Sequence, residues 1–394
     1  MEFYMKKYNT VAERIKAANE SKYFTSVCET LYDADLYVAV DDTIMIKGVL
    51  SSAGSAMLEN YKAPFSAETV EKLQKNKVAV VGKTKVNEFG ISGCFFENPK
   101  DASLLAVKDQ LVDAALCNDF SGDARRLAVL NGIYYIHPTY GIVSRYGLIA
   151  SVSSADAVGL AFADPDAGFK LLQYIAGHDD KDGTSRPAVS YEYKADRDIK
   201  NMKTAYIGNV KNIASEKYVE DLKSAGVDVV TVDLKYLDYA AEIYQILSSA
   251  EISNNISRFD GVKFGIRAEE FRGINELYLN TRGTLFSAGT KLTAIIGSMV
   301  LSDKYYKQNY DKSMRIRRLI RDELIGLLET YDVLITPLKG TGDDFGDTAF
   351  TALANLAGLP ALSIPVKDGA GVQLIAKPLD ENALYSMIKG GAHS

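Results

Sequence analysis

The chain has 394 residues, including 30 glycines and 9 prolines, and 47% of its residues are hydrophobic. This composition is typical of a soluble globular protein and argues against a disordered chain. The net charge of -6 gives no general attraction for nucleic acid, because phosphate binding needs a concentrated basic surface. The three cysteines, Cys28, Cys94 and Cys117, lie far apart without a C-x-x-C motif, which disfavours a disulfide framework or a thiolate metal site and fits a reducing cytoplasm.

The N-terminal residues 1–30 place apolar side chains at helical spacing and predict one helix that ends near Ser21. They contain no apolar run long enough for a signal peptide or a membrane span, so we expect a cytoplasmic protein without membrane association. A strand is predicted at 36–40, with the sequence LYVAV. The basic clusters at 124–126 and 314–321 are local exceptions to the acidic charge. For the second we favour an amphipathic helix with a solvated face over an RNA contact.

Residues 51–90 predict a helix through Met57 and Leu58, a second helix opened by Ser66, and a buried strand with the sequence KVAVVG. The GKT at 82–84 lacks the G-x-x-x-x-G that precedes the lysine of a phosphate-binding loop, so a nucleotide site is not predicted. The segment ASLLAVKDQLVDAALCNDFSG, at 102–122, carries apolar residues at helical spacing and predicts a single buried helix.

The second half of the chain predicts alternating strands and helices. A turn at 177–184 contains His178, for which we favour a capping or turn role. With only His137 and His393 elsewhere, no histidine cluster for a metal is present, and no metal site is predicted. Residues 203–235 predict a strand-helix-strand unit, followed by a helix from Asp238 to Asn255 and a buried strand that ends at Pro337.

Three segments carry a resemblance to a known family: HPTYGIVSRYGL at 137–148, SSAD at 153–156 and AEISNNISRFDGVKFG at 250–265. The sequence resembles the amidase signature family, and within it the A subunits of tRNA-dependent amidotransferases. The resemblance implies an α/β fold in which a large mixed β-sheet is sandwiched between α-helices. It also implies one amidase-like domain over 1–394 with a trimmed N-terminal helix and no cofactor. Chain ends are often poorly ordered, so we expect frayed ends at 1–12 and 390–394.

The residues that would perform the family's chemistry differ here. In the family, a lysine at the end of an apolar strand activates the nucleophilic serine through a cis-serine. The segment VAVDDTIMIKG places Asp41 at the lysine position, with Asp42 and Thr43 on the family's aspartate and asparagine. Aspartate has the opposite charge and a pKa near 4 rather than about 10. Lys47 matches a different lysine of the family and is interpreted as a surface turn residue.

The glycine-serine loop that carries the cis-serine is replaced by the predicted helix, and the nucleophile position holds Asp123. Asp119, Gly122 and Arg125 match the surrounding motif, which makes them remnants of a substrate pocket. Ser121 lies two positions before the nucleophile position of the family. As a displaced nucleophile it is disfavoured, because a misplacement of about 1 Å can already cost a hundredfold in rate.

Substrate-binding positions of the family are only partly retained. The resemblance aligns Arg317 with an arginine that helps to hold the glutamine substrate, and Tyr310 belongs to the same tyrosine-containing helix. The family's substrate-binding aspartate aligns with Thr348, and Asp347 is one place off. These residues predict a pocket remnant rather than a complete glutamine site.

The leading hypothesis is a catalytically degenerate relative of the amidotransferase A subunit that acts as a scaffold or regulatory partner. Its expected partners are B-type or C-type subunits or an A-like partner, with tRNA contacted only indirectly in such a complex. An alternative is a functional amidase or amidotransferase subunit with a rebuilt site, in which carboxylates share a proton or bind a divalent ion. Another alternative is a sensor that binds small amides. The carboxylates of the rebuilt site would be Asp41, Asp42, Asp119 and Asp123.

Overall fold

A computed structural model describes residues 10–28, 32–91, 100, 102–187, 191–210, 212–338, 344–367 and 369–391. Cys94, His393 and most of the two predicted frayed ends lie outside these residues. Of the helices that are described, none is both long and apolar enough to cross a membrane.

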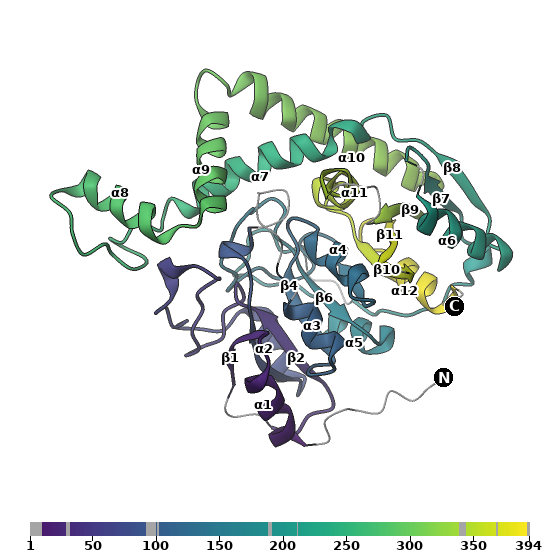
Figure 1. Cartoon of the computed structure of the whole chain (residues 1–394). Coiled ribbons are helices and arrows are strands. Elements are labelled where there is room, and N and C mark those ends of the chain that lie inside the picture. The colour runs from purple at the N-terminus through teal and green to yellow at the C-terminus, as the bar shows by residue number, and fades with distance from the viewer. Residues whose placement is uncertain are drawn as a thin grey trace.

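The described strands form one mixed sheet in the order β1-β3-β2-β4-β6-β5-β10-β11-β9-β7-β8 (Figure 1). The pairs β2–β3, β2–β4, β7–β8 and β7–β9 are parallel, and the other neighbours are antiparallel. The strands are β1 Phe24–Val27, β2 Tyr37–Asp41, β3 Ala79–Thr84, β4 Ala114–Asn118, β5 Tyr134–His137, β6 Val158–Phe162, β7 Thr204–Ile207, β8 Val229–Val232, β9 Val333–Leu338, β10 Ala361–Lys367 and β11 Ala370–Ala376.

Helices cover both faces of this sheet, as the resemblance implied. The helices are α1 Val11–Glu20, α2 Glu68–Lys75, α3 Ala102–Lys108, α4 Asp123–Leu130, α5 Pro165–Ile175, α6 Ile213–Ser224, α7 Ala240–Ile256, α8 Ile274–Leu285, α9 Ala288–Leu301, α10 Lys312–Thr330, α11 Asp344–Ala357 and α12 Glu381–Gly390. In Figure 1, α8 lies far from the sheet, beyond α7 and α9.

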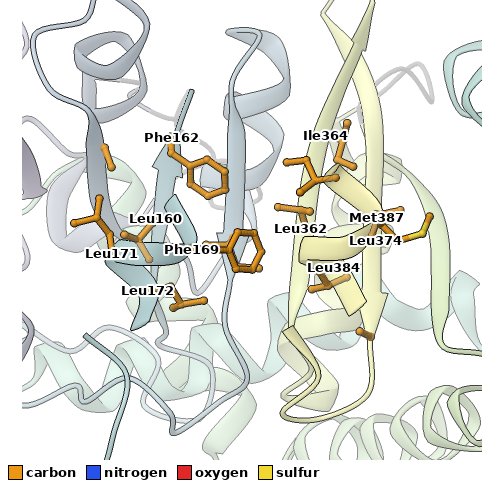
Figure 2. Close-up of a cluster of buried hydrophobic side chains, with 14 of the residues drawn as sticks. Leu160, Phe162, Phe169, Leu171, Leu172, Leu362, Ile364, Leu374, Leu384 and Met387 are labelled. Atoms are coloured by element: carbon orange, nitrogen blue, oxygen red, sulfur yellow. The ribbon is translucent and has the colours of Figure 1, made fainter. Parts of the chain in front are cut away.

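One apolar layer lies between the sheet and the helices α2, α5, α6 and α12. Figure 2 shows part of it, where Phe162 of β6 and Leu362 of β10 face Phe169 of α5 and Leu384 of α12. Alternate residues of the same strands point to the opposite face, as the period-two geometry of a strand requires. There they pack against α3, α4, α7, α10 and α11. The strands are buried on both faces, which explains their nearly continuous apolar sequences.

Several predicted elements are confirmed, but the helix predicted over 102–122 is wrong. The predicted strand at 36–40 is β2, and the predicted strand-helix-strand unit at 203–235 is β7-α6-β8 with parallel strands. The segment 102–122 folds as α3 followed by β4. Helix α3 ends at Lys108, Gln110 takes a left-handed φ of 60°, and the next apolar run enters the sheet between β2 and β6. An apolar run buried on all sides fits a helix or a central strand equally well, so periodicity alone could not separate them.

The predicted N-terminal helix ending near Ser21 is confirmed as α1, whereas the predicted helix at Met57 needs correction. The described part of 1–30 contains α1, with a Thr10 capping box, and then strand β1, which pairs with β3. The strand forms because Phe24 can enter the apolar layer beside β3. The helix predicted through Met57 and Leu58 is only a three-residue 3-10 helix, Ala56–Leu58, capped by Ser55.

A buried carboxylate joins the HPTYG segment to the C-terminal helix. Glu381, the first residue of α12, is fully buried, and its Oε1 accepts hydrogen bonds from the backbone N–H of Thr139 (2.9 Å) and from the Thr139 hydroxyl (2.6 Å). Burial raises the pKa of Glu381, and the two bonds from Thr139 only partly oppose that effect. Ionised Glu381 is therefore less favourable in the folded chain than in the unfolded chain.

We predict that Glu381→Gln raises the free energy of unfolding at pH 8, with an advantage that shrinks as the pH falls to about 5. A carboxyl whose folded pKa is raised stabilises the fold when it is protonated. That contribution is lost as the pH rises from the unfolded value, about 4.5, through the folded pKa. The amide keeps the acceptor oxygen but cannot ionise. Urea unfolding of both proteins at the two pH values measures the difference.

The control is Glu59→Gln, which makes the same chemical change at an exposed position and should show no such pH dependence. A Glu381→Gln protein that is equally destabilised at pH 5 and pH 8 would contradict the account, because it would mean that the charged form is tolerated.

Candidate functional site

Two strand ends bring the predicted site positions together. Strands β2 and β4 are parallel neighbours, so their C-terminal ends meet at the same edge of the sheet. Asp41 is the last residue of β2, and the chain after β4 turns through 119–122 into α4. The backbone N–H of Asn118 donates to Oδ2 of Asp41 at 2.7 Å, which ties the two ends together.

Asp41, at the position where the resemblance places a lysine, is bonded within the protein through both of its carboxylate oxygens. It is buried, and its Oδ1 accepts from the backbone N–H of Thr43 at 2.9 Å and from the Thr43 hydroxyl. Burial raises the pKa of Asp41, and the donors from Thr43 and Asn118 oppose that rise. The side chain closes the turn after β2 and presents no cation to the site.

Asp123, at the position of the nucleophile, is the first residue of α4. Its Oδ1 forms an ion pair with Nη2 of Arg126 at 2.9 Å, and its Oδ2 accepts from the Ser121 hydroxyl at 2.9 Å. A carboxylate at this place is also stabilised by the N-terminal end of the helix dipole. The preceding Gly122 has a φ of 79°, and a Cβ there would lie 2.4 Å from Cβ of Thr351, so only glycine fits this turn.

A small cavity of about 50 Å3 lies at these positions, with Asp41, Asn118, Ser121 and Asp123 in its wall. Lys85 and Lys100 also line it. A volume of this size, as the described residues enclose it, holds a few water molecules rather than a glutamine side chain. Asp42 and Asp119 are not among the residues that line it.

Asp119 is the centre of a fully buried polar network. Its Oδ2 lies 2.6 Å from Nε of Arg125 and 3.0 Å from Nδ1 of His137. Burial alone would raise the pKa of Asp119, but the Arg125 guanidinium and the His137 ring hold it below its usual value. Burial and the charge of Arg125 lower the pKa of His137, so the ring is neutral at pH 7.

Arg125 extends this network to α11 and β11. Its Nη1 donates to the backbone oxygen of Thr351 at 3.0 Å and to Oε1 of Gln373, and its Nη2 donates to Oδ1 of Asn355. Asn355 in turn donates to the backbone oxygen of Asp119 at 2.8 Å. The side chain is fully buried. Arg125 therefore holds α4, α11 and β11 together and does not face a substrate cavity, and the basic cluster at 124–126 is no exposed surface.

Lys83 is a buried cation that was not predicted from the sequence. Nζ of Lys83, in the interior of β3, lies 2.9 Å from Oδ1 of Asp42 and 2.6 Å from Oγ of Ser51. All three residues are almost completely buried. Burial lowers the pKa of Lys83, and the Asp42 carboxylate opposes that effect. The signal in the sequence was a lysine inside an otherwise apolar strand, which needs a buried carboxylate partner.

The predicted remnants of a substrate pocket also bind within the chain. Arg317 donates through Nε to the backbone oxygen of Leu356 (2.9 Å), through Nη1 to Oγ of Ser154 (3.0 Å) and through Nη2 to the backbone oxygen of Ser154 (3.2 Å). Tyr310 lies in the π-helical turn Lys307–Asp311, with its ring centroid 5.3 Å from that of Tyr306. Asp347 is buried in α11. None of the three lines the 50 Å3 cavity.

The structure brings together only two of the four carboxylates of the rebuilt-site hypothesis. Asp41 and Asp123 line the same cavity, whereas Asp42 binds Lys83 and Asp119 binds Arg125. The part of the chain that the structure describes has no group of three or more His, Cys, Asp or Glu residues arranged to hold a metal ion. His178 lies in an exposed turn, with its ring nitrogens 2.7 Å from the backbone oxygen of Arg186 and 3.0 Å from Asp180.

Comparisons with known proteins place this framework among amidases. The family model described as "Amidase" matches residues 10–98 and 102–385. The chain is 34% identical over 395 residues to the A subunit of glutamyl-tRNA(Gln) amidotransferase from Latilactobacillus sakei, covering 89% of this chain and 81% of that protein. It is 31% identical over 427 residues to the A subunit of the same enzyme from Thermotoga maritima, covering 98% and 88%.

Solved structures give the same result. The crystal structure of the A subunit from Thermotoga maritima superposes with a TM-score of 0.76 at 28% identity, covering 96% of this chain and 89% of that chain. The structure of 6-aminohexanoate cyclic dimer hydrolase complexed with substrate superposes with a TM-score of 0.72 at 18% identity, covering 90% and 83%. At that identity the second likeness concerns the fold alone.

We predict that Arg125→Met lowers the free energy of unfolding by about 3–5 kcal/mol, because it leaves the Asp119 carboxylate buried without its cation. Arg315→Met is the matched control, since Arg315 forms its ion pair with Asp311 at the exposed surface and should lose only about 0–1 kcal/mol. Urea unfolding of both variants measures the difference. Equal losses would mean that the buried network does not hold the elements around the site.

Proposed function

Because the chain belongs to the amidase family, we propose that it is a catalytically degenerate homologue of the A subunit of a tRNA-dependent amidotransferase. In this proposal it works in the cytoplasm as a scaffold or regulatory partner and does not itself hydrolyse glutamine. The family framework is retained over nearly the whole chain, and the groups that would carry the reaction are exchanged.

The observation that carries the proposal is the bonding of Asp41 and Asp123. A serine nucleophile requires an adjacent base and a group that relays its proton. Asp41 is held by donors from Thr43 and Asn118, and Asp123 is held by Arg126. Each carboxylate therefore has its own hydrogen-bond or ion-pair partners within the protein. This bonding supports a structural role for both residues.

The residue at the family's substrate-binding arginine position and the size of the cavity support the same conclusion. An arginine that binds a glutamine carboxylate must have free N–H groups directed into a pocket. Three of the five N–H groups of Arg317, one each on Nε, Nη1 and Nη2, instead donate to Leu356 and Ser154. The Ser154 loop is fixed further by Glu251, which accepts from the Ser154 backbone N–H at 2.9 Å and from its hydroxyl. The cavity of about 50 Å3 would also have to widen several-fold for a glutamine to enter.

A second candidate function is amide hydrolysis by the displaced Ser121. One observation favours it: the Ser121 hydroxyl donates to Asp123 at 2.9 Å, in the wall of the cavity. Asp123 would then be the base. Its other oxygen, however, is held in an ion pair with Nη2 of Arg126 at 2.9 Å, so the carboxylate already has a structural contact of its own. We therefore rank this candidate second, ahead of a shared-proton carboxylate pair or an amide sensor.

The purified protein should release no ammonia from glutamine or asparagine above the rate of a buffer blank. The assay includes the wild type, Ser121→Ala, Asp123→Ala and Asp123→Asn, with and without magnesium, and its positive control is a catalytically intact A subunit. A wild-type rate that falls on Ser121→Ala would identify the displaced nucleophile as active. A magnesium-dependent rate lost on Asp123→Asn would identify a rebuilt carboxylate site. Either result contradicts the proposal.

The partner role predicts stable association with B-type or C-type subunits. We expect these subunits to co-purify with the tagged chain from its native cells, and we expect tRNA to co-purify only when they are present. A chain that purifies alone from native cells at physiological salt, with no such subunit detected by mass spectrometry, would contradict the scaffold role.

A further inference from the structure

A second cavity, about ten times larger, lies on another part of the surface, and none of its lining residues belongs to the 50 Å3 cavity. Its volume is about 500 Å3, and it lies between the segments 57–61, 148–150 and 258–266. This size falls in the range of small-molecule sites, roughly 300–1,000 Å3. Nothing in the proposed function uses it.

The floor of this cavity is apolar and already formed. Met57, Leu58 and Phe259 are buried there. The Phe259 ring stacks on the Phe89 ring with the two centroids 4.9 Å apart, and this contact fixes the position of Phe259. The backbone N–H of Ile266 donates to the Met57 carbonyl at 2.9 Å and joins two of the walls. A ligand would therefore meet a preorganised apolar surface.

The close fit between these walls depends on a glycine. Gly265 has a φ of 88°, and a Cβ at this position would lie 2.4 Å from Sδ of Met57. The glycine lets the 258–266 segment pass directly over Met57. Backbone atoms of this segment therefore form the cavity wall beside Met57. Side chains form the rim of the cavity.

The charges at this rim have one sign. Arg258 and Lys263 line the cavity, and among the described residues no aspartate or glutamate does, although the whole chain has a net charge of -6. Arg258 donates through Nε and Nη2 to Asn255, at 2.8 Å and 3.1 Å. Within the described residues, its Nη1 and the Lys263 ammonium make no hydrogen bond or ion pair. Both cations are thus available to an anion.

A third donor lies in the wall. The hydroxyl of Tyr61 contacts Sδ of Met45 at 3.5 Å, and a thioether is a weak hydrogen-bond acceptor. Burial raises the pKa of Tyr61, so the phenol is neutral and keeps its proton at physiological pH. A ligand oxygen would offer this hydroxyl a much better acceptor than the sulfur does.

From these features we propose that the cavity binds an amphipathic carboxylate, a small molecule with an aliphatic chain or aromatic ring and one carboxylate group. The apolar part lies on Met57, Leu58 and Phe259. The carboxylate lies at the rim, near Lys263 and Arg258, and accepts a hydrogen bond from Tyr61. A neutral amide of the same shape would gain less from the two cations, so the ligand differs from the substrates of an amidase.

Isothermal titration calorimetry with octanoate and with octanamide tests the proposal on the full chain. We expect octanoate to bind at one site, and we expect octanamide to bind more weakly by roughly fivefold or more, as loss of a charge-assisted contact implies. Octanoate binding should also weaken as salt is raised from low to physiological concentration, because the rim cations are partly exposed. Absence of octanoate binding, or equal binding of the two compounds, would overturn the proposal.

Three variants locate the site. Lys263→Glu and Tyr61→Phe should each weaken octanoate binding, the first by roughly tenfold and the second by roughly threefold to tenfold. Ala150→Phe should block it by filling the cavity. Lys223→Glu makes the same charge change on the exposed face of α6 and is the control that should bind as the wild type does. Octanoate binding that none of the three site variants alters would place the ligand elsewhere and overturn the assignment.

The test also separates a ligand cavity from an interface between copies of the chain. If the cavity belongs to such an interface, light scattering will find a dimer that dissociates on Phe264→Glu, a change at an exposed rim residue. That outcome contradicts the proposal. If the octanoate-binding proposal fails, the proposal of a degenerate scaffold still stands, because ammonia release and partner binding are measured separately.

Discussion

The buried ion pair between Arg125 and Asp119 fixes the elements around the candidate site. The two charges lie 2.6 Å apart without solvent contact, and through them the end of β4 is joined to α4, to His137 of β5, to α11 and to Gln373 of β11. Removing one partner of such a pair leaves an uncompensated charge in the interior, which is far costlier than losing a surface pair. This requirement explains how the loop and α4 keep their place in the fold beside positions where Asp41 and Asp123 stand.

The pairing of charged groups also distinguishes residues that hold the fold together from residues that would react with a substrate. In the described part of the chain, three charged groups at or near the family's site positions have partners from the protein: Asp42 has Lys83, Asp123 has Arg126, and Arg317 has Ser154 and Leu356. A reactive site normally keeps groups whose charge is perturbed and not yet neutralised by its surroundings. Polar groups satisfied in this way stabilise the fold and leave little free energy for a substrate.

The sequence predicted the framework better than the site. The strand-helix-strand unit β7-α6-β8 followed from its own pattern, and the mixed sheet between helices followed from the resemblance. The helix predicted at 102–122 failed because a central strand such as β4 is buried on both faces and loses the alternation that marks a strand. Lys83 was missed because its partner Asp42 lies on a neighbouring strand end. Alignment placed Asp41 and Asp123, but only the structure gives their donors.

In the proposed degenerate homologue, no serine at this site is activated. Labelling with a fluorophosphonate, which reacts with activated serine hydroxyls, tests it most directly, because the reagent needs neither a glutamine pocket nor a protein partner. Intact-mass spectrometry followed by peptide mapping should find no adduct on Ser121 under conditions that fully label a serine amidase. A stoichiometric adduct on Ser121 that disappears in Ser121→Ala would contradict the claim.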